Sequence, residues 1–220
     1  MFKIKTLLLF LLTCLVALTT KGQQPVNYKL DDLLLQNKLD TSDAQQVHSL
    51  NDAQYPGIAA KGIVWLKDVS FKDGTIDVDL RGKNVFLQSF VGIAFHAKDS
   101  STYEAVYFRP FRFRIADTAT RKWSVQYSSI PGYDYSVLRK EHPGVYENNI
   151  KPAPEPEAWL HATLVIKNGW ITVYVNHSSS PSLKVKALGA PTEGKIGLWS
   201  SPGSLSSDFA NLRIRKLTKF

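Results

Sequence analysis

Ionisable side chains lie among apolar residues in the stretch from 90 to 110, which reads FVGIAFHAKDSSTYEAVYFRP. This stretch predicts two β-strands around a short polar turn, and it carries His96, Glu104, Tyr107 and Arg109. A charged group buried without a partner is costly, so each of these groups needs a partner, water or a ligand. The predicted hairpin is therefore the first place to look for a site.

The alternation of side chains along a β-strand indicates which of these groups can meet. If the alternate apolar residues of 90–95 fill the core, His96 faces the opposite side, and Gln126 joins it by the alternation of its own strand. Alternation does not decide which side chains of the strand after the turn join this group, because Glu104 and Arg109 lie on opposite faces unless a bulge or the strand end intervenes.

The chemistry of this group suits a sugar, whose hydroxyls need hydrogen-bond donors and acceptors and whose C–H face packs on aromatic rings. If the site is catalytic, Glu104 serves as general acid/base and His96 assists it. The residues expected to bind substrate are Tyr107, Arg109, Gln126, Arg139 and His142. A competing interpretation pairs Glu104 with Arg112 or Arg114 and leaves His96 at the rim.

A glycosidase with two catalytic carboxylates is the obvious alternative chemistry. Asp77 and Asp79 share one face of an alternating strand, roughly 6.6–6.8 Å apart along it. Arg81 stands where a third acid completes the motif of family 16 glycosidases, so we reject that mechanism and interpret the pair as the polar face of a half-exposed strand.

Two further clusters of charge are weaker candidates. Arginine alternates with Pro or Phe from Arg109 to Arg114, which as a strand would present three guanidinium groups to a carboxylate-bearing or sulfated ligand. A solvated strand face is the favoured interpretation. Glu141, His142 and Glu147 suggest a metal, but they show no recognised ligand spacing, so no metal and no cofactor are expected.

The first 22 residues are typical of a signal peptide. Lys3 and Lys5 precede an apolar run from Leu7 to Leu18, which is short for a membrane span, and a retained anchor helix is the alternative. The only cysteine, Cys14, lies inside this run, so the mature chain has no disulfide. The formal charge of +8 includes three lysines of this segment, and the remaining basic residues are scattered, which argues against nucleic-acid binding.

The elements expected beyond this segment are almost all strands. Residues 75–80 alternate cleanly, and Asn168-Gly169 between two apolar runs predicts a hairpin. Several short strands separated by turn signals indicate an all-β sandwich. We expect an N-terminal extension over 23–54, a jelly-roll domain over 55–220, and within it one long irregular loop over 128–157.

Motifs across residues 55–216 carry a family resemblance. The segments DGTIDVDLRG, FVGIAFHAKDSSTYEAVYFRPFRF, SVQY, EHPGVYEN, WLHATLVI and SDFANLRI together resemble secreted bacterial proteins of the concanavalin A-like superfamily. Within it they are most similar to the 3-keto-disaccharide hydrolase-like group, also called family 16 glycoside hydrolase-like. The resemblance implies a jelly-roll sandwich of two antiparallel sheets that binds ligands on its concave face.

We therefore expect a secreted or periplasmic monomer that binds or processes a carbohydrate, with no partner nucleic acid and no membrane span after signal cleavage. The first alternative, which the resemblance implies, is a hydrolase or lyase that cleaves 3-keto glycosides with Glu104 as general acid/base. The second alternative is a non-catalytic interaction protein of the cell envelope.

Overall fold

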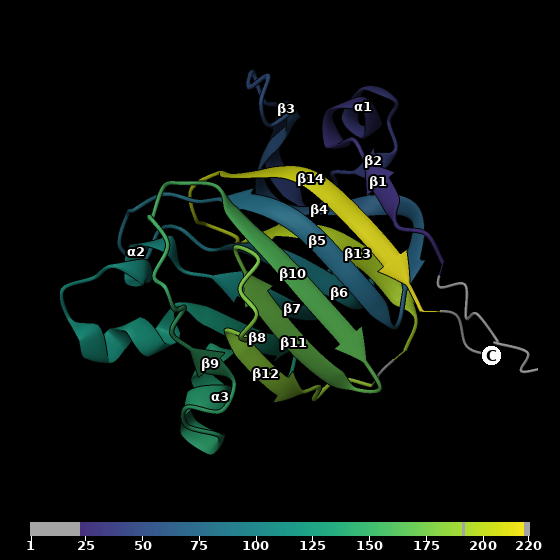
Figure 1. Cartoon of the computed structure of the whole chain (residues 1–220). Coiled ribbons are helices and arrows are strands. Elements are labelled where there is room, and N and C mark those ends of the chain that lie inside the picture. The colour runs from purple at the N-terminus through teal and green to yellow at the C-terminus, as the bar shows by residue number, and fades with distance from the viewer. Residues whose placement is uncertain (1–22, 191, 218–220) are drawn as a thin grey trace, which may run out of the picture.

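The computed structural model describes residues 23–190 and 192–217, so the expected signal segment lies outside the described residues. Two antiparallel sheets stack as a sandwich with short helices at its margins (Figure 1), which confirms the predicted all-β jelly-roll class. Among the described residues, no helix has the length and apolar character needed to cross a bilayer.

The strands are β1 Val26–Tyr28, β2 Leu39–Asp40, β3 Ala44–Ser49, β4 Gly57–Phe71, β5 Gly74–Arg81, β6 Val91–Asp99, β7 Thr102–Phe108, β8 Val125–Ile130, β9 Glu147–Asn148, β10 Leu160–Lys167, β11 Trp170–Val175, β12 Leu183–Lys186, β13 Gly194–Ser200 and β14 Ser207–Lys216. The helices are α1 Leu30–Leu35, α2 Pro110–Phe113 and α3 Tyr135–Glu141, with a 3₁₀ helix η1 at Thr118–Trp123.

Strand β4 belongs to both sheets. Its first part, from Gly57 to Ala60, pairs with β14, and its second part, from Ile63 onward, pairs with β13. Gly62 lies between the two parts with a φ of +96°, which glycine adopts without the clash that a Cβ would cause. Sheet A therefore runs β12-β11-β10-β5-β14-β4, and sheet B runs β4-β13-β6-β7-β8-β9.

Alternating apolar side chains of both sheets form the core between them. β5 buries Ile76, Val78 and Leu80 and leaves the residues between them half-buried, as its sequence predicts. β6 contributes Ile93 and Phe95 to the same core. The residues that alternate with these face outward, so each sheet also presents an outer face of its own.

The segment 128–157 contains more regular structure than the single loop predicted for it. Its first residues continue β8, α3 follows, and β9 pairs with β8. The Asp134 carboxylate starts α3 by accepting the backbone N–H groups of Ser136 and Val137 at 2.8 and 3.0 Å. In this way α3 brings Arg139 back beside β9, at 2.8 Å from Glu147.

The N-terminal residues from 26 to 49 are hydrogen-bonded to the sandwich. β1 pairs with β14, while β2 and β3 pair with the two parts of β4. In Figure 1 this purple-to-blue segment lies on the far side of the sandwich from α3.

Candidate functional site

One row of side chains crosses the outer face of sheet B. The strand register places Trp199 beside Gly92, Gly92 beside Tyr107, Tyr107 beside Gln126, and Gln126 beside Glu147. The ring centroids of Trp199 and Tyr107 lie 4.9 Å apart over Gly92, and a Cβ at that glycine would meet a backbone oxygen at 2.1 Å. The row therefore joins two aromatic rings to an amide and a carboxylate.

Arg109 extends this row from the residue after β7. Its Nη2 donates to Tyr107 Oη at 3.0 Å and to Gln126 Oε1 at 2.6 Å, and its Nη1 donates to Trp123 O at 2.8 Å. Pro110 begins α2 immediately afterwards, so the chain leaves the strand direction at Arg109. Arg109 lies two residues after Tyr107, so the alternation of the strand places both side chains on one face, although only 4% of Arg109 is exposed.

Two more guanidinium groups lie close to Arg109. Arg112 on α2 donates to Thr120 Oγ1 at 2.7 Å, and its guanidinium lies 5.1 Å from the centre of the Trp123 ring. The guanidinium of Arg139 on α3 lies 4.2 Å from the same ring. Trp123 therefore holds both cations by cation–π contacts.

These groups line one cavity of about 300 Å³, which we term the arginine cavity. It is lined by Arg109, Arg112 and Arg139 together with Leu87, Phe90, Phe111, Trp123 and Tyr135. A concave site that joins aromatic surface to a few convergent polar groups is the usual form of a small-molecule site.

Charge is not balanced around the arginine cavity. Arg139 pairs with Glu147, but within residues 23–190 and 192–217 neither Arg109 nor Arg112 forms an ion pair with a carboxylate. Burial lowers the pKa of both guanidinium groups. Two buried polar atoms, Arg112 Nε and Gln126 Nε2, also find no hydrogen-bond partner in the described part of the chain.

Of the five residues expected to bind substrate, Arg109 and Arg139 line the arginine cavity, whereas Tyr107 and Gln126 contact Arg109 but are not part of that lining. The fifth, His142, ends α3 with its ring 5.6 Å from that of Tyr146, outside the lining of the arginine cavity. Among the described residues no three His, Cys, Asp or Glu side chains gather in a way that could hold a metal ion.

Glu104 and His96 lie on the inner side of sheet B instead of its outer face. Glu104 alternates with the core residue Val106, and its carboxylate accepts from Tyr127 Oη at 2.7 Å and meets His96 Nδ1 at 3.1 Å. His96 has a φ of +53° at an irregularity in the β6–β7 register, which turns its ring away from the outer face. The prediction that His96 faces the same side as Gln126 is therefore wrong.

Hydrogen bonds engage both residues of this buried pair. His96 Nε2 donates to Lys72 O at 2.6 Å. Burial, and then the neighbouring Glu104 carboxylate, raise the pKa of Tyr127, so its hydroxyl remains a donor. Both Glu104 and His96 also line a separate cavity of about 230 Å³, together with Tyr133.

The competing interpretation for Glu104 is also not what the structure shows. Glu104 contacts a histidine and a tyrosine, whereas Arg114 pairs with Glu155 and Arg112 faces the arginine cavity.

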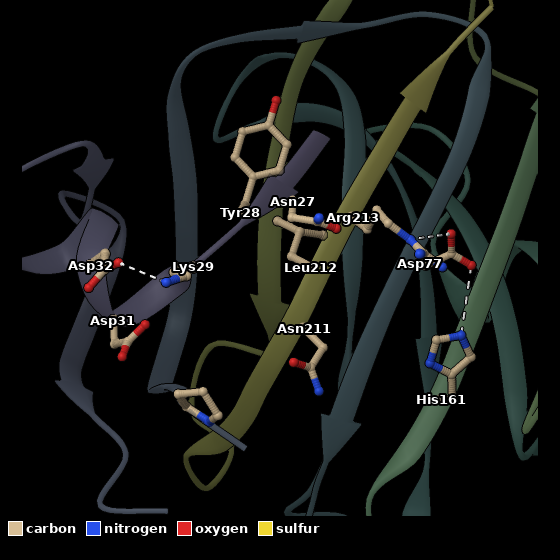
Figure 2. A pocket seen from close by; sticks show the side chains of 11 residues that line it. Asn27, Tyr28, Lys29, Asp31, Asp32, Asp77, His161, Asn211, Leu212 and Arg213 are labelled. Atoms are coloured by element: carbon tan, nitrogen blue, oxygen red, sulfur yellow. Dashed lines mark ion pairs between the residues drawn. The ribbon is translucent and has the colours of Figure 1, made fainter. Parts of the chain in front are cut away.

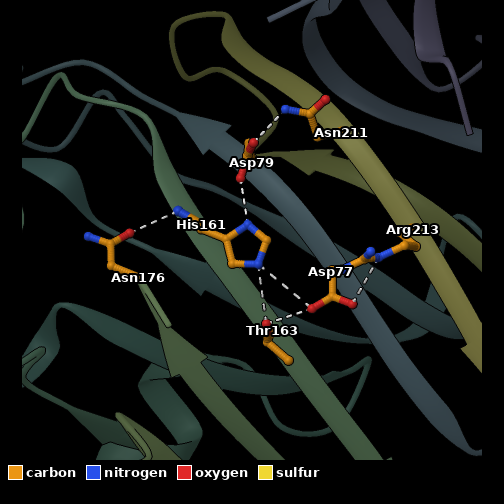
Figure 3. Close-up of polar contacts among 7 residues, drawn as sticks. All are labelled: Asp77, Asp79, His161, Thr163, Asn176, Asn211 and Arg213. Atoms are coloured by element: carbon orange, nitrogen blue, oxygen red, sulfur yellow. Dashed lines mark hydrogen bonds and ion pairs between the residues drawn. The ribbon is translucent and has the colours of Figure 1, made fainter. Parts of the chain in front are cut away.

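A second polar cluster occupies the outer face of sheet A (Figure 3). His161 Nδ1 lies 2.6 Å from Asp79 Oδ1, and His161 Nε2 lies 3.7 Å from Asp77 Oδ1. Asn211 donates to Asp79 at 2.7 Å, and Arg213 Nε lies 3.7 Å from Asp77. The neighbouring carboxylates of Asp77 and Asp79 raise the pKa of His161 to about 9, because their effect outweighs that of its burial.

The same interactions lower the pKa of both aspartates. Burial acts against this shift, but hydrogen bonds from His161 and from Thr163 or Asn211 outweigh it. Two carboxylates thus face one imidazolium and one guanidinium, so the cluster is close to neutral. A groove of about 530 Å³ runs from this cluster to Tyr28 and Asp31 (Figure 2). Because its charges are already paired, we consider the arginine cavity the better candidate.

Sequence reasoning missed the part of the site that α2 and η1 supply. Arg112 was considered only within the RPFRFR stretch, for which a solvated strand face was the favoured interpretation, and Trp123 was not among the expected binding residues. Proline at the first position of a helix is a known start signal, and Pro110 could have indicated the turn that buries Arg112.

Solved structures share the jelly-roll sandwich fold of this protein. The chain is similar to the carbohydrate-binding module CBM66 from Bacillus subtilis, with a TM-score of 0.56 and 11% identity over 81% of this chain and 96% of that one. A Bacillus subtilis protein of unknown function with a galectin-like fold gives a TM-score of 0.56 and 12% identity over 91% and 99% of the two chains.

The exoplasmic/lumenal domain of VIP36 in its Ca²⁺-bound form is also similar, with a TM-score of 0.53 and 11% identity over 83% of this chain and 85% of that one. At these identities the likenesses define the fold alone. No protein-family model matches the chain, and no curated protein matches its sequence.

Proposed function

We propose that this protein binds a carbohydrate on the outer face of sheet B, with the arginine cavity as the centre of the site. The observation that carries the proposal is the meeting of aromatic rings and hydrogen-bond donors in one cavity of about 300 Å³. A sugar ring offers hydroxyl oxygens to the donors and an apolar C–H face to the rings. The fold supports the proposal, since a carbohydrate-binding module shares it.

The partly exposed ring of Tyr135 makes this proposal testable without disturbing the core. Tyr135 lines the arginine cavity and is 52% exposed, so Tyr135→Ala should leave the fold intact. Trp170 offers a matched control, because it is an exposed aromatic residue (45%) at the start of β11 in sheet A.

The experiment is a glycan-array screen followed by calorimetric titration of any ligand found. Tyr135→Ala should weaken binding by at least about tenfold, which corresponds to roughly 1.4 kcal/mol and lies within the range measured for aromatic contacts. Trp170→Ala should leave the affinity unchanged. If no glycan binds, or if only the Trp170 variant loses affinity, the proposed site is wrong.

A second candidate function is cleavage of a 3-keto glycoside with Glu104 as general acid/base. One observation favours it, namely that Glu104 and His96 together line the cavity of about 230 Å³. Against it, Glu104 is 2% exposed and its two oxygens already contact His96 and Tyr127. Glu104→Gln should abolish turnover of a 3-keto glycoside if this function holds, and full turnover by that variant would exclude Glu104 as the catalytic group.

We also propose that the protein acts outside the cytoplasm after cleavage near residue 22. The support is the lysine-flanked apolar run at the start of the sequence. N-terminal sequencing of the protein recovered from its producing cells tests this proposal, and an intact Met1 would contradict it.

A further inference from the structure

The charges around the arginine cavity indicate what kind of ligand it takes. Arg109 and Arg112 are 4% and 9% exposed, and Arg139 is the only one of the three cavity arginines that forms an ion pair within the described residues. Three guanidinium groups thus surround one small volume with a single carboxylate, Glu147, in contact. The cluster on sheet A shows the opposite arrangement, with each aspartate beside a cationic partner.

Burying like charges together is unfavourable unless an opposite charge accompanies them. Other groups can escape this penalty by changing protonation, but arginine does not lose its proton in proteins. Neutral acceptors and the Trp123 ring hold Arg109 and Arg112 but do not balance their charge, which a bound anion would do. An oxyanion also suits the free N–H groups, because guanidinium forks bind carboxylates and sulfates through paired hydrogen bonds.

The lining of the cavity distinguishes between anionic ligands. Phe90, Trp123 and Tyr135 supply aromatic surface beside the guanidinium groups, and a bare inorganic anion makes no use of such surface. An acidic sugar presents both parts at once, a charged group for the arginines and a C–H face for the rings.

We propose that the arginine cavity recognises an acidic saccharide, in which a carboxylate or sulfate group of a sugar residue lies among Arg109, Arg112 and Arg139. This inference rests on the proposed carbohydrate-binding function and adds the chemical class of the ligand to it.

The test compares saccharides that differ only in charge. Calorimetric titration would use oligogalacturonates against their methyl esters, and sulfated galactan oligosaccharides against the same chains after desulfation, which are neutral. The acidic member of at least one pair should bind at least about tenfold tighter than its neutral partner, and raising NaCl from about 50 to about 300 mM should narrow this difference by screening.

Variants connect the preference to the cavity. Arg112→Met keeps an unbranched apolar stem against the Phe86 and Trp123 rings while it removes the charge. Arg215→Met is the matched control, because Arg215 is an exposed residue of β14 in sheet A. The first variant should reduce the preference for the acidic saccharide to less than about threefold, and the second should not change it.

Arg109→Met is the more drastic change, since Arg109 holds both Tyr107 and Gln126, and it could unfold the region. The Arg112 variant, checked by thermal melting, keeps the test decisive.

The outcomes separate the two proposals. Equal binding of acidic and neutral partners would overturn the present inference and leave carbohydrate binding standing. If the Arg112 and Arg215 variants lose the preference for the acidic saccharide to the same extent, the preference reflects general charge attraction and the inference is overturned. Binding of an oligoglutamate peptide as tight as that of the acidic saccharide would overturn it in the same way. The absence of binding to every saccharide would overturn both proposals.

Discussion

His161 should stabilise the folded protein in a way that disappears in alkaline solution. Its ring lies between two carboxylates, 2.6 Å from Asp79 and 3.7 Å from Asp77, and its pKa of about 9 lies well above the 6.5 of a free imidazole. The perturbation is His161→Gln combined with a change of pH. His48 on β3, which is exposed, gives the matched control His48→Gln.

The sign and size of the effect follow from this difference in pKa. Below about pH 6.5 the ring of His161 is protonated in both the folded and the unfolded chain, so its contribution is fully present. The contribution is lost as pH rises through about 9, where the folded imidazolium gives up its proton. At 1.36 kcal/mol per pKa unit the full difference corresponds to roughly 3 kcal/mol. Because 20% of the His161 side chain is exposed, solvent screening reduces our expectation to about 1–2 kcal/mol.

The assay is urea unfolding followed by tryptophan fluorescence between about pH 6 and about pH 10. The wild-type protein should lose about 1–2 kcal/mol of unfolding free energy over this range that the His161→Gln variant does not lose, while the His48→Gln variant should follow the wild type. Parallel pH dependences for wild type and His161→Gln would refute the reasoning. So would an NMR titration midpoint near 6.5 for the His161 ring.

Two further predictions concern buried contacts of sheet B. Tyr127→Phe removes the hydroxyl that donates to Glu104 at 2.7 Å and accepts a backbone N–H, and it should lower the unfolding free energy by about 1–3 kcal/mol; an unchanged urea midpoint would contradict this. Gly92→Ala should lower the free energy of unfolding by about 1–3 kcal/mol and lower the melting temperature accordingly, because the added Cβ would meet a backbone oxygen at 2.1 Å. Gly132→Ala, with open space around it, is the control, and equal melting temperatures for the two variants would show that the strands adjust without cost.

Much of the sandwich could be predicted from local pattern. The alternation of Ile76, Val78 and Leu80 indicated which face of β5 is buried, and the structure confirms it. The turn at Asn168-Gly169 was equally readable, since both residues have the positive φ that such a hairpin requires. These features depend on neighbours in sequence, which is why one sequence suffices to predict them.

The site was predicted less completely because it depends on departures from regular alternation. The positive φ of His96 turns its ring to the side of Glu104, and no propensity of histidine announces such an irregularity. Arg109 and Arg112 line one cavity because α2 begins directly after Arg109, since a continued strand would place the two residues on opposite faces. Arg139 meets Glu147 through the fold of α3, a contact between elements that strand patterns do not encode.

The pairing of residues 26–49 with β4 and β14 gives the N-terminal segment a protective role. β1 continues along β14 where β4 leaves it, and β2 and β3 occupy the other margin of β4. A chain shortened to begin at residue 55 would leave these backbone N–H and C=O groups without partners, and open strand margins recruit strands from other molecules. We therefore expect such a shortened chain to self-associate. Residues 26–49 carry no part of the arginine cavity, but on this reasoning they prevent the protein from aggregating.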